Sequence, residues 1–198
     1  MRRVLTFLFA TLIGLGTGIY SALSMSGLLP SDTASGAGMD IDGWKGDLSL
    51  GTADTSPYLR ARVARHGLLA LAKSEAVYFV RDRDGRGRRL DENCDYRLSG
   101  GTFSAGWWSI TLYDEQNFLP ANTDGALSFD ASRADEERWT TLISAQKPAE
   151  TKNWVSSRNA DQFDLTLRLY MPSKDVLDRP NEIDMPKIER LECRENPQ

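Results

Sequence analysis

Histidine and cysteine are scarce in this chain of 198 residues, which holds one histidine and two cysteines. Catalytic relays of the Ser-His-Asp or Cys-His type therefore have a single available base, His66, which stands among arginines in a predicted helix. Two cysteines and one histidine do not make an ordinary zinc set. We expect no metal site and no cofactor, and we interpret His66 as a surface or core-edge residue.

The chain also lacks an excess of basic side chains. It has 28 acidic and 24 basic residues, for a formal net charge of −4. A protein that binds phosphates needs a basic face that releases counterions from the nucleic acid. The composition therefore predicts no nucleic-acid partner.

Charge is missing altogether between Arg3 and Asp32, where the segment from Val4 to Leu29 is almost entirely apolar. As a helix this segment would be about 39 Å long, enough to cross a hydrocarbon core of about 30 Å. Arginines before it and acids after it predict a cytoplasmic N-terminus and an exported remainder. We therefore expect residues 1–30 to be a membrane anchor. A cleaved signal peptide is the alternative, with Ala22-Leu23-Ser24 as a tolerable cleavage site, but its apolar region is usually shorter.

Two glycines in the apolar segment, Gly14 and Gly18, have the small-xxx-small spacing that lets two membrane helices approach closely. Glycine is common in membrane-spanning helices for other reasons as well. Weak dimerisation through this pair is a secondary expectation.

The two cysteines, Cys94 and Cys193, gain a role from export. An exported chain meets an oxidising compartment, in which thiols pair. We predict a Cys94–Cys193 disulfide, which in the chain-entropy model would stabilise the fold by about 4 to 5 kcal/mol because it closes a long loop. The alternative is a pair of thiols too far apart to meet.

Behind the anchor, composition divides the chain into a flexible linker over residues 31–43 and one domain over residues 44–198. The linker is rich in Gly, Ser, Ala and Asp and has no apolar periodicity. In the domain, Ser56 as N-cap and Pro57 at the first position predict a helix from about Tyr58 to Ala72 that covers a core. The prolines at the C-terminal end predict an extended strap there.

From Glu75 onward the apolar residues recur with a period of two, which is typical of strands. The clearest case is Phe163–Tyr170, where Leu165, Leu167 and Leu169 alternate with polar residues. Short strands separated by turn residues favour an antiparallel β-sandwich or jelly roll with one helix packed outside. The expected strands are Ala76–Val80, Tyr96–Gly100, Trp107–Tyr113, Ala126–Phe129, Trp139–Ala145 and Phe163–Tyr170.

Several of these segments resemble one known family. WWSITLYD (Trp107–Asp114), RARVARHGLLALAKSEAVYF (Arg60–Phe79), Asn153-Trp154 and LTLRLYMP (Leu165–Pro172) resemble the domain of unknown function 1214 family in its short, membrane-anchored bacterial form. The resemblance runs from about Trp44 to Cys193 and implies a jelly-roll-like β-sandwich. In other members this domain follows a second β domain that is missing from this sequence. The resemblance implies a bacterial inner-membrane protein with a periplasmic domain, but no activity and no catalytic residue.

Aromatic residues are the most informative functional feature of the domain. Trp107 and Trp108 point to opposite sides of one strand, so one of them is expected outside the core. An outward Trp107 beside Tyr113 could offer a flat platform to a sugar or another ligand with an apolar face. We name as candidate ligand-binding residues Trp107, Tyr113, Trp139 and Trp154; the alternative is that these rings serve core packing or lie under the C-terminal strap.

Acidic residues supply a weaker set of candidates. Glycoside hydrolysis needs two carboxyl groups held about 5 to 9.5 Å apart, and the available acids lie mostly in predicted turns, where Asp is favoured for backbone reasons. We expect Glu75 to be half-buried and to pair with Arg168. The segment Asp82–Gly87 resembles a calcium loop but lacks two ligands, so a hairpin tip is the better interpretation. The candidate acids are Asp91, Glu92, Asp95, Asp114 and Asp124.

Together these features predict a membrane-anchored envelope module that binds a glycan, a lipid or an envelope protein through its aromatic face. The alternative is a hydrolase-type envelope enzyme that uses paired carboxylates.

Overall fold

A single long helix, α1 (Arg2–Met25), forms the N-terminal part of the chain. The structure is a computed structural model that describes residues 2–25, 38–48, 57–58, 60–61, 71–134, 137–149 and 151–194. Helix α1 is 24 residues long with a mean hydropathy of 1.7, so it is long and apolar enough to cross a membrane. Its threonine hydroxyls donate to carbonyls of the preceding turn, as Thr11 does to Phe7 at 2.9 Å, so these polar groups are satisfied within the helix.

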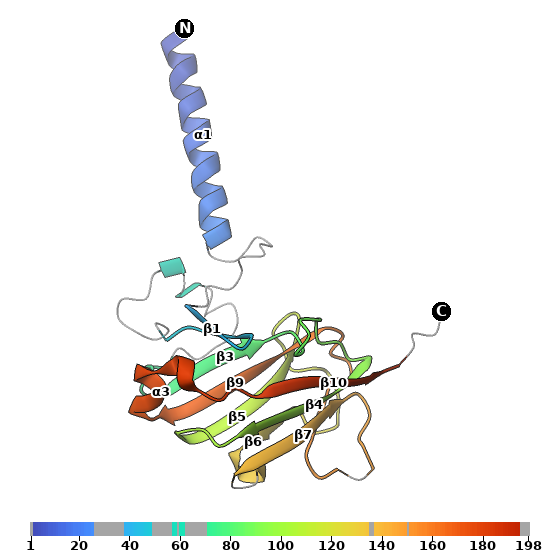
Figure 1. Cartoon of the computed structure of the whole chain (residues 1–198). Coiled ribbons are helices and arrows are strands. Elements are labelled where there is room, and N and C mark those ends of the chain that lie inside the picture. Colours follow the sequence, from blue (N-terminus) through green and yellow to red (C-terminus); the bar gives the residue numbers. More distant parts are fainter. Residues whose placement is uncertain are drawn as a thin grey trace. The chain divides into compact units, whose positions relative to one another are not determined.

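The rest of the described chain is mainly β and forms two sheets (Figure 1). The first sheet has six strands in the order β1-β2-β3-β9-β5-β6, all antiparallel to their neighbours. The bounds of these strands are β1 Met39–Ile41, β2 Trp44–Gly46, β3 Ala76–Arg81, β5 Ala105–Asp114, β6 Ser128–Asp130 and β9 Phe163–Pro172.

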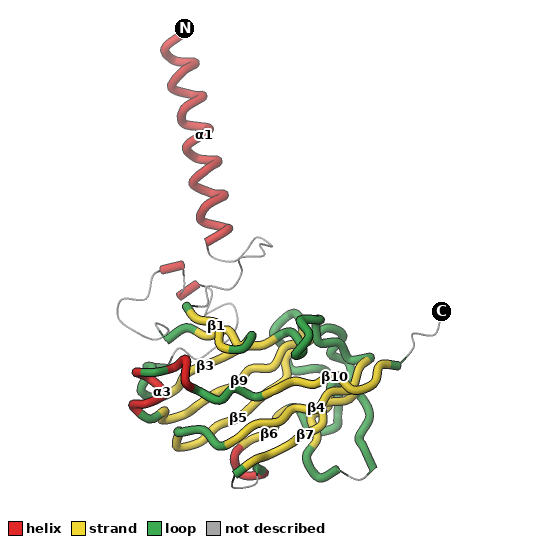
Figure 2. The backbone as a smooth tube through the Cα atoms, in the orientation of Figure 1, coloured by secondary structure: helices red, strands yellow, loops and turns green. Residues whose placement is uncertain are grey.

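The second sheet has four strands in the order β10-β4-β7-β8, in which β7 and β8 run parallel. This pair is the one departure from the predicted antiparallel pattern among the described residues. Short helical turns connect the strands (Figure 2). The bounds are β4 Cys94–Gly101, β7 Arg138–Ser144, β8 Trp154–Ser156, β10 Lys187–Cys193, α3 Lys174–Asp178, and the 3-10 turns η1 Ala131–Arg133 and η2 Pro180–Glu182.

The core lies between the two sheets and confirms the sandwich architecture. Strands β5 and β9 place Ile110 opposite Leu167, and the neighbouring pairs on this face are apolar as well. Tyr96 and Ile143 of the second sheet are buried in the same cluster. Each strand turns one set of alternate residues inward, so the first sheet keeps a second face that points away from the core.

The first strand begins earlier in the sequence, and the last strand ends later, than the sequence predicted. Met39–Ile41 form β1, with Ile41 buried, so the end of the segment expected to be a linker is part of the six-stranded sheet. Most of the predicted helix from Tyr58 to Ala72, including His66, lies outside the described residues. Within this range Tyr58, Arg60 and Ala61 are described and are helical.

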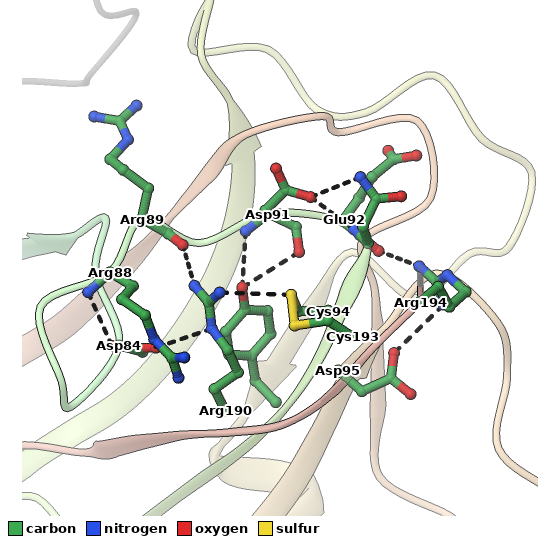
Figure 3. Close-up of a disulfide and its surroundings, with 12 residues drawn as sticks. Asp84, Arg88, Arg89, Asp91, Glu92, Cys94, Asp95, Arg190, Cys193 and Arg194 are labelled. Carbon is green, nitrogen blue, oxygen red and sulfur yellow. Dashed lines mark hydrogen bonds and ion pairs between the residues drawn. A yellow bond between two sulfur atoms is a disulfide. The ribbon is translucent and has the colours of Figure 1, made fainter. Parts of the chain in front are cut away.

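The C-terminal segment is a strand rather than the expected strap, because β10 pairs with β4 and completes the edge of the second sheet. The predicted disulfide forms there: Cys94 and Cys193 join the two strands with their Cα atoms 3.9 Å apart (Figure 3). Beside it, Arg190 Nε lies 2.9 Å from Oδ2 of Asp84, whose side chain is buried. The disulfide and this ion pair hold the end of the chain to the sandwich.

Candidate ligand-binding face

The face of the six-stranded sheet that points away from the core carries large aromatic and charged side chains. In β5, Trp107, Ser109, Thr111 and Tyr113 alternate with the core residues Trp108, Ile110 and Leu112. In β9 the same alternation places four polar or aromatic residues opposite them, and β3 adds Tyr78 opposite Arg168. We call this surface the outer face and define it by Tyr78, Trp107, Tyr113, Asp164, Arg168 and Tyr170.

Arg168 occupies the middle of the outer face, between two tyrosine rings. Its Nη2 donates a hydrogen bond of 2.7 Å to the hydroxyl of Tyr113. Its guanidinium carbon lies 5.3 Å from the centre of the Tyr113 ring and 6.0 Å from that of Tyr78, within cation–π range. Beneath this long side chain the strands carry small residues, and Ser109 and Thr166 are buried.

Trp107 and Tyr170 form an aromatic pair at one end of the outer face. Their ring centres are 5.4 Å apart, and the rings are tilted by 47°. Trp107 is 39% exposed, which sets it apart from the buried tryptophans of the sandwich. An exposed pair of this kind presents an apolar surface on which a planar ligand group can stack.

Asp164 lies at the other end of the outer face, opposite Tyr113. Burial of its carboxyl is the main cause that raises its pKa to about 7, and the negative charge of Asp82 adds to the shift. The Thr166 hydroxyl, 3.3 Å from Oδ1, and the charges of Arg168 and Arg89 act in the opposite direction. Asp164 is therefore a carboxyl group that exchanges its proton near neutral pH.

The pKa of Tyr78 is raised as well, chiefly by burial of its phenol and then by the negative form of Tyr170, while Arg168 lowers it. The phenol of Tyr78 therefore stays protonated at neutral pH.

The four predicted aromatic ligand residues do not form one platform. Trp107 and Tyr113 share the outer face, but they are six residues apart in one strand, which is about 20 Å. Trp139 belongs to the second sheet and is buried, with its ring 5.0 Å from that of Trp108 and its indole N–H donating to Gly101 at 2.7 Å. Trp154 is also buried and donates to the Ser144 carbonyl at 3.1 Å. These two rings are structural, because the second sheet turns them inward.

Glu75 and Arg168 are not the predicted pair. Glu75 is exposed at the start of β3, where its Oε2 accepts a hydrogen bond of 3.1 Å from the Ala72 N–H. The chain turns just before β3, and the carboxylate caps that turn instead of reaching the sheet. Arg168 donates its hydrogen bond to the Tyr113 hydroxyl instead of to Glu75.

The five candidate acids serve turns and surface contacts. The Asp91 carboxylate accepts from the Asn93 N–H, that of Glu92 from Ala160 and Asp161, and that of Asp114 from Gln116 and Phe118. Asp95 lies 3.5 Å from Arg194, and Asp124 accepts from Ser156 and Arg158. Backbone capping explains their position in the sequence.

The segment Asp82–Gly87 is a turn held by its own side chains. The Asp84 carboxylate accepts from the N–H groups of Arg86 and Arg88, and the Arg88 side chain lies 3.0 Å away. Burial tends to raise the pKa of Asp84, but these hydrogen bonds lower it below its usual value. Within the described part of the chain, no three potential metal ligands gather at one place.

Tyr78, Asp164 and Tyr170 belong to the outer face, although the sequence did not single them out. The alternation in Phe163–Tyr170 already put Asp164, Arg168 and Tyr170 on one side of a strand, which was the available signal. The neighbours from β3 and β5 depend on strand order, which alternation alone does not provide.

Comparison with known proteins adds a family and a fold. A family model described as "Protein of unknown function (DUF1214)" matches residues 75–174. The crystal structure of the VPA0106 protein from Vibrio parahaemolyticus is similar, with a TM-score of 0.60 and 21% identity over 91% of this chain and 44% of that one. An uncharacterized protein from Burkholderia cenocepacia matches at 23% identity and a TM-score of 0.36, over 62% of this chain and 31% of that one. The chain thus spans less than half the length of either solved chain, and no curated protein matches it.

Proposed function

The chain belongs to the family of proteins of unknown function DUF1214, and from that premise we propose that it is a membrane-anchored binding module whose ligand lies on the outer face of the six-stranded sheet. The observation that carries the proposal is the pair of the exposed Trp107 and the half-buried Tyr170 beside Arg168. Aromatic rings and arginine are the side chains that contribute most to recognition when they stand on a surface.

Export to the periplasm across the bacterial inner membrane is part of this proposal. Helix α1 supports an anchor over residues 4–29, and the Cys94–Cys193 disulfide fits an oxidising compartment. The paired arginines before the helix favour a cytoplasmic N-terminus. Close approach of two such helices at Gly14 and Gly18 would let modules pair in the membrane.

Binding to the outer face can be tested with the full chain in detergent micelles. The protein is screened against cell-wall glycans, lipids and small molecules of the envelope, and each hit is measured again with Trp107→Ala. We expect hits whose affinity falls at least tenfold in the variant, because one half of the stacking pair is removed.

Phe118→Ala is the matched control, since Phe118 is 69% exposed but lies in the turn after β5. It should bind as the unchanged protein does. Hits that bind both variants equally well, or a screen without hits, would contradict a ligand site on the outer face.

A second candidate function, hydrolysis with paired carboxyl groups, is favoured by one observation. Asp164, with a pKa of about 7, could act as a general acid, and Asp82, which is 3.0 Å from Arg89, is a second carboxyl group close enough to affect it. The candidate predicts hydrolysis of envelope glycosides or esters that is abolished by Asp164→Asn. Absence of turnover over a range of such substrates between pH 5 and 8 would rule it out.

A further inference from the structure

Arg168 is a partly buried cation that forms no ion pair with any of the described residues. Among them it contacts the Tyr113 hydroxyl and two tyrosine rings, and it acts on the carboxyl of Asp164 only over a longer distance than an ion pair. A guanidinium has five N–H donors, so most of those of Arg168 are unused. A guanidinium in this position binds most strongly to an anion that accepts two parallel hydrogen bonds from it.

The surroundings of Arg168 suit a single negative charge. Arg89, the other arginine that acts on Asp164, is already 3.0 Å from Asp82 and 3.0 Å from Glu115. Asp164 and Asp82 add negative charge near the site. A dianion such as a phosphate monoester would meet one available cation and two acids, whereas a monocarboxylate is matched by Arg168 alone.

The Trp107–Tyr170 pair indicates that the ligand carries a planar apolar group in addition to its negative charge. Tyr170 is two residues from Arg168 in β9 and points to the same face, so their Cα atoms are about 7 Å apart. Trp107 lies opposite Tyr170, and its ring is the most exposed of the outer face. The Arg168 guanidinium extends toward the Tyr113 hydroxyl, away from this aromatic pair, so a planar apolar group must be joined to the carboxylate by a flexible spacer to contact both positions.

We propose that the outer face binds organic monocarboxylates that carry a planar apolar group, with Arg168 holding the carboxylate and Trp107 and Tyr170 stacking on the planar group. This assignment rests on the proposed function and names the chemical class of its ligand.

Affinity for such a ligand depends on the charge of Asp164. The charged and titratable groups that face it are Asp82 after β3, Arg89 before β4, Tyr113 of β5 and Arg168 of β9. Of these carboxyl groups, Asp164 changes its charge near neutral pH, and its negative form repels an incoming carboxylate. Binding is therefore tighter at pH 6 than at pH 8.

The test uses the full chain in detergent micelles and three probes of one shape: 3-phenylpropanoate, the neutral 3-phenylpropanamide, and 3-phenylpropyl phosphate. Isothermal titration at pH 6 and pH 8 gives the affinities for the unchanged protein, Arg168→Gln, Trp107→Ala and Asp164→Asn. Arg97→Gln, which removes an exposed arginine of the second sheet, is the control.

We expect 3-phenylpropanoate to bind at least tenfold more tightly than the amide and the phosphate, and Arg168→Gln to remove that preference. Asp164→Asn should abolish the difference between pH 6 and pH 8, and Arg97→Gln should change nothing. Equal affinities for the three probes that Arg168→Gln leaves unchanged would overturn the monocarboxylate assignment. If Trp107→Ala still lowered the affinity for all three probes, the outer face would remain a binding surface although the monocarboxylate assignment had failed. If no probe bound, or if Trp107→Ala did not change the affinities, both the monocarboxylate assignment and the proposed function would fail.

Discussion

Asp164 ties the stability of the sandwich to pH. Its pKa rises from 3.8 in the ordinary state to about 7 in the fold, with burial as the main cause. Between these two values the folded state keeps a proton that the unfolded state has lost, so raising the pH favours unfolding. The stabilisation is fully present below about pH 4 and is lost as the pH rises through 7.

Asp164→Asn is therefore expected to be more stable than the unchanged protein at pH 8 and of similar stability at pH 4. From pH 5 to pH 8 the free energy of unfolding of the unchanged protein should fall by about 2 kcal/mol more than that of the variant, allowing for screening at a partly exposed group. Urea unfolding at several pH values measures both. Parallel stability curves for the two proteins would show that Asp164 titrates normally.

Gly100 makes room for the indole of Trp139. A Cβ at this position would lie 2.6 Å from the Trp139 ring, and that ring also donates a hydrogen bond to the Gly101 carbonyl. Gly100→Ala should lower the free energy of unfolding by about 1 to 3 kcal/mol because the core is overpacked. Gly38→Ala, whose Cβ would meet nothing closer than 3.5 Å, is the control in the same thermal unfolding experiment. Equal losses in both variants would mean that the Trp139 contact is not the cause.

At the scale of single residues, the sequence predicted which side chains alternate along a strand, but it did not predict which sheet the strand belongs to or which set of side chains points into the core. Trp107 and Trp139 look alike as strand residues, yet one is exposed and the other is 2% exposed, because Trp107 points to the outer face of the first sheet and Trp139 points from the second sheet into the core. The raised pKa of Asp164 could not be anticipated either, because its main cause is burial, which depends on the strands that pack around the carboxyl group, and its second cause is the charge of Asp82 from another part of the chain.

Strand β10 depends on one buried ion pair. Arg190 lies 2.9 Å from Asp84, and their side chains are 13% and 1% exposed. The Arg190 guanidinium also lies over the Tyr96 ring at 5.3 Å. Removing the arginine leaves a buried carboxylate with fewer partners, so Arg190→Met should cost about 3 kcal/mol.

The ion pair between Arg97 of β4 and Glu189 of β10 is a matched control, because its two side chains are 2.7 Å apart but 46% and 62% exposed. Arg97→Met should cost less than about 1 kcal/mol. Hydrogen exchange of the β10 amides and urea unfolding compare the two variants. Losses of equal size would contradict the special role of the Asp84–Arg190 pair.

At the scale of elements, strands with strict alternation were predicted well and short or proline-flanked strands were not. Strand β9 covers the predicted Phe163–Tyr170 and β5 the predicted Trp107–Tyr113. Strands β1 and β8, of three residues each, are too short to show a period. Strand β10 follows Pro186 and pairs with β4 from about 90 residues earlier, which no local pattern reveals.

For the whole molecule, export and the disulfide are expected to depend on α1. The full chain produced in a bacterium should fractionate with the inner membrane, and a C-terminal alkaline phosphatase fusion should be active. Its thiols should be blocked, because Cys94 and Cys193 are joined. A chain without residues 2–25 should stay in the cytosol with two reactive thiols.

An inactive fusion and two reactive thiols in the full-length protein would contradict export. Release of a soluble oxidised domain would instead show that the N-terminal segment is cleaved as a signal peptide, and would leave the compartment unchanged.

The outer face is the surface on which we propose that this module binds its ligand. The most direct measurement is mass spectrometry of the small molecules that stay bound when the full chain is purified in mild detergent from a bacterial membrane. The unchanged protein is compared with Trp107→Ala, Arg168→Gln and the control Phe118→Ala. We predict at least one organic acid that accompanies the unchanged protein and Phe118→Ala and is depleted at least tenfold in the other two. Indistinguishable profiles from all four proteins, empty ones included, would contradict a binding function for the outer face.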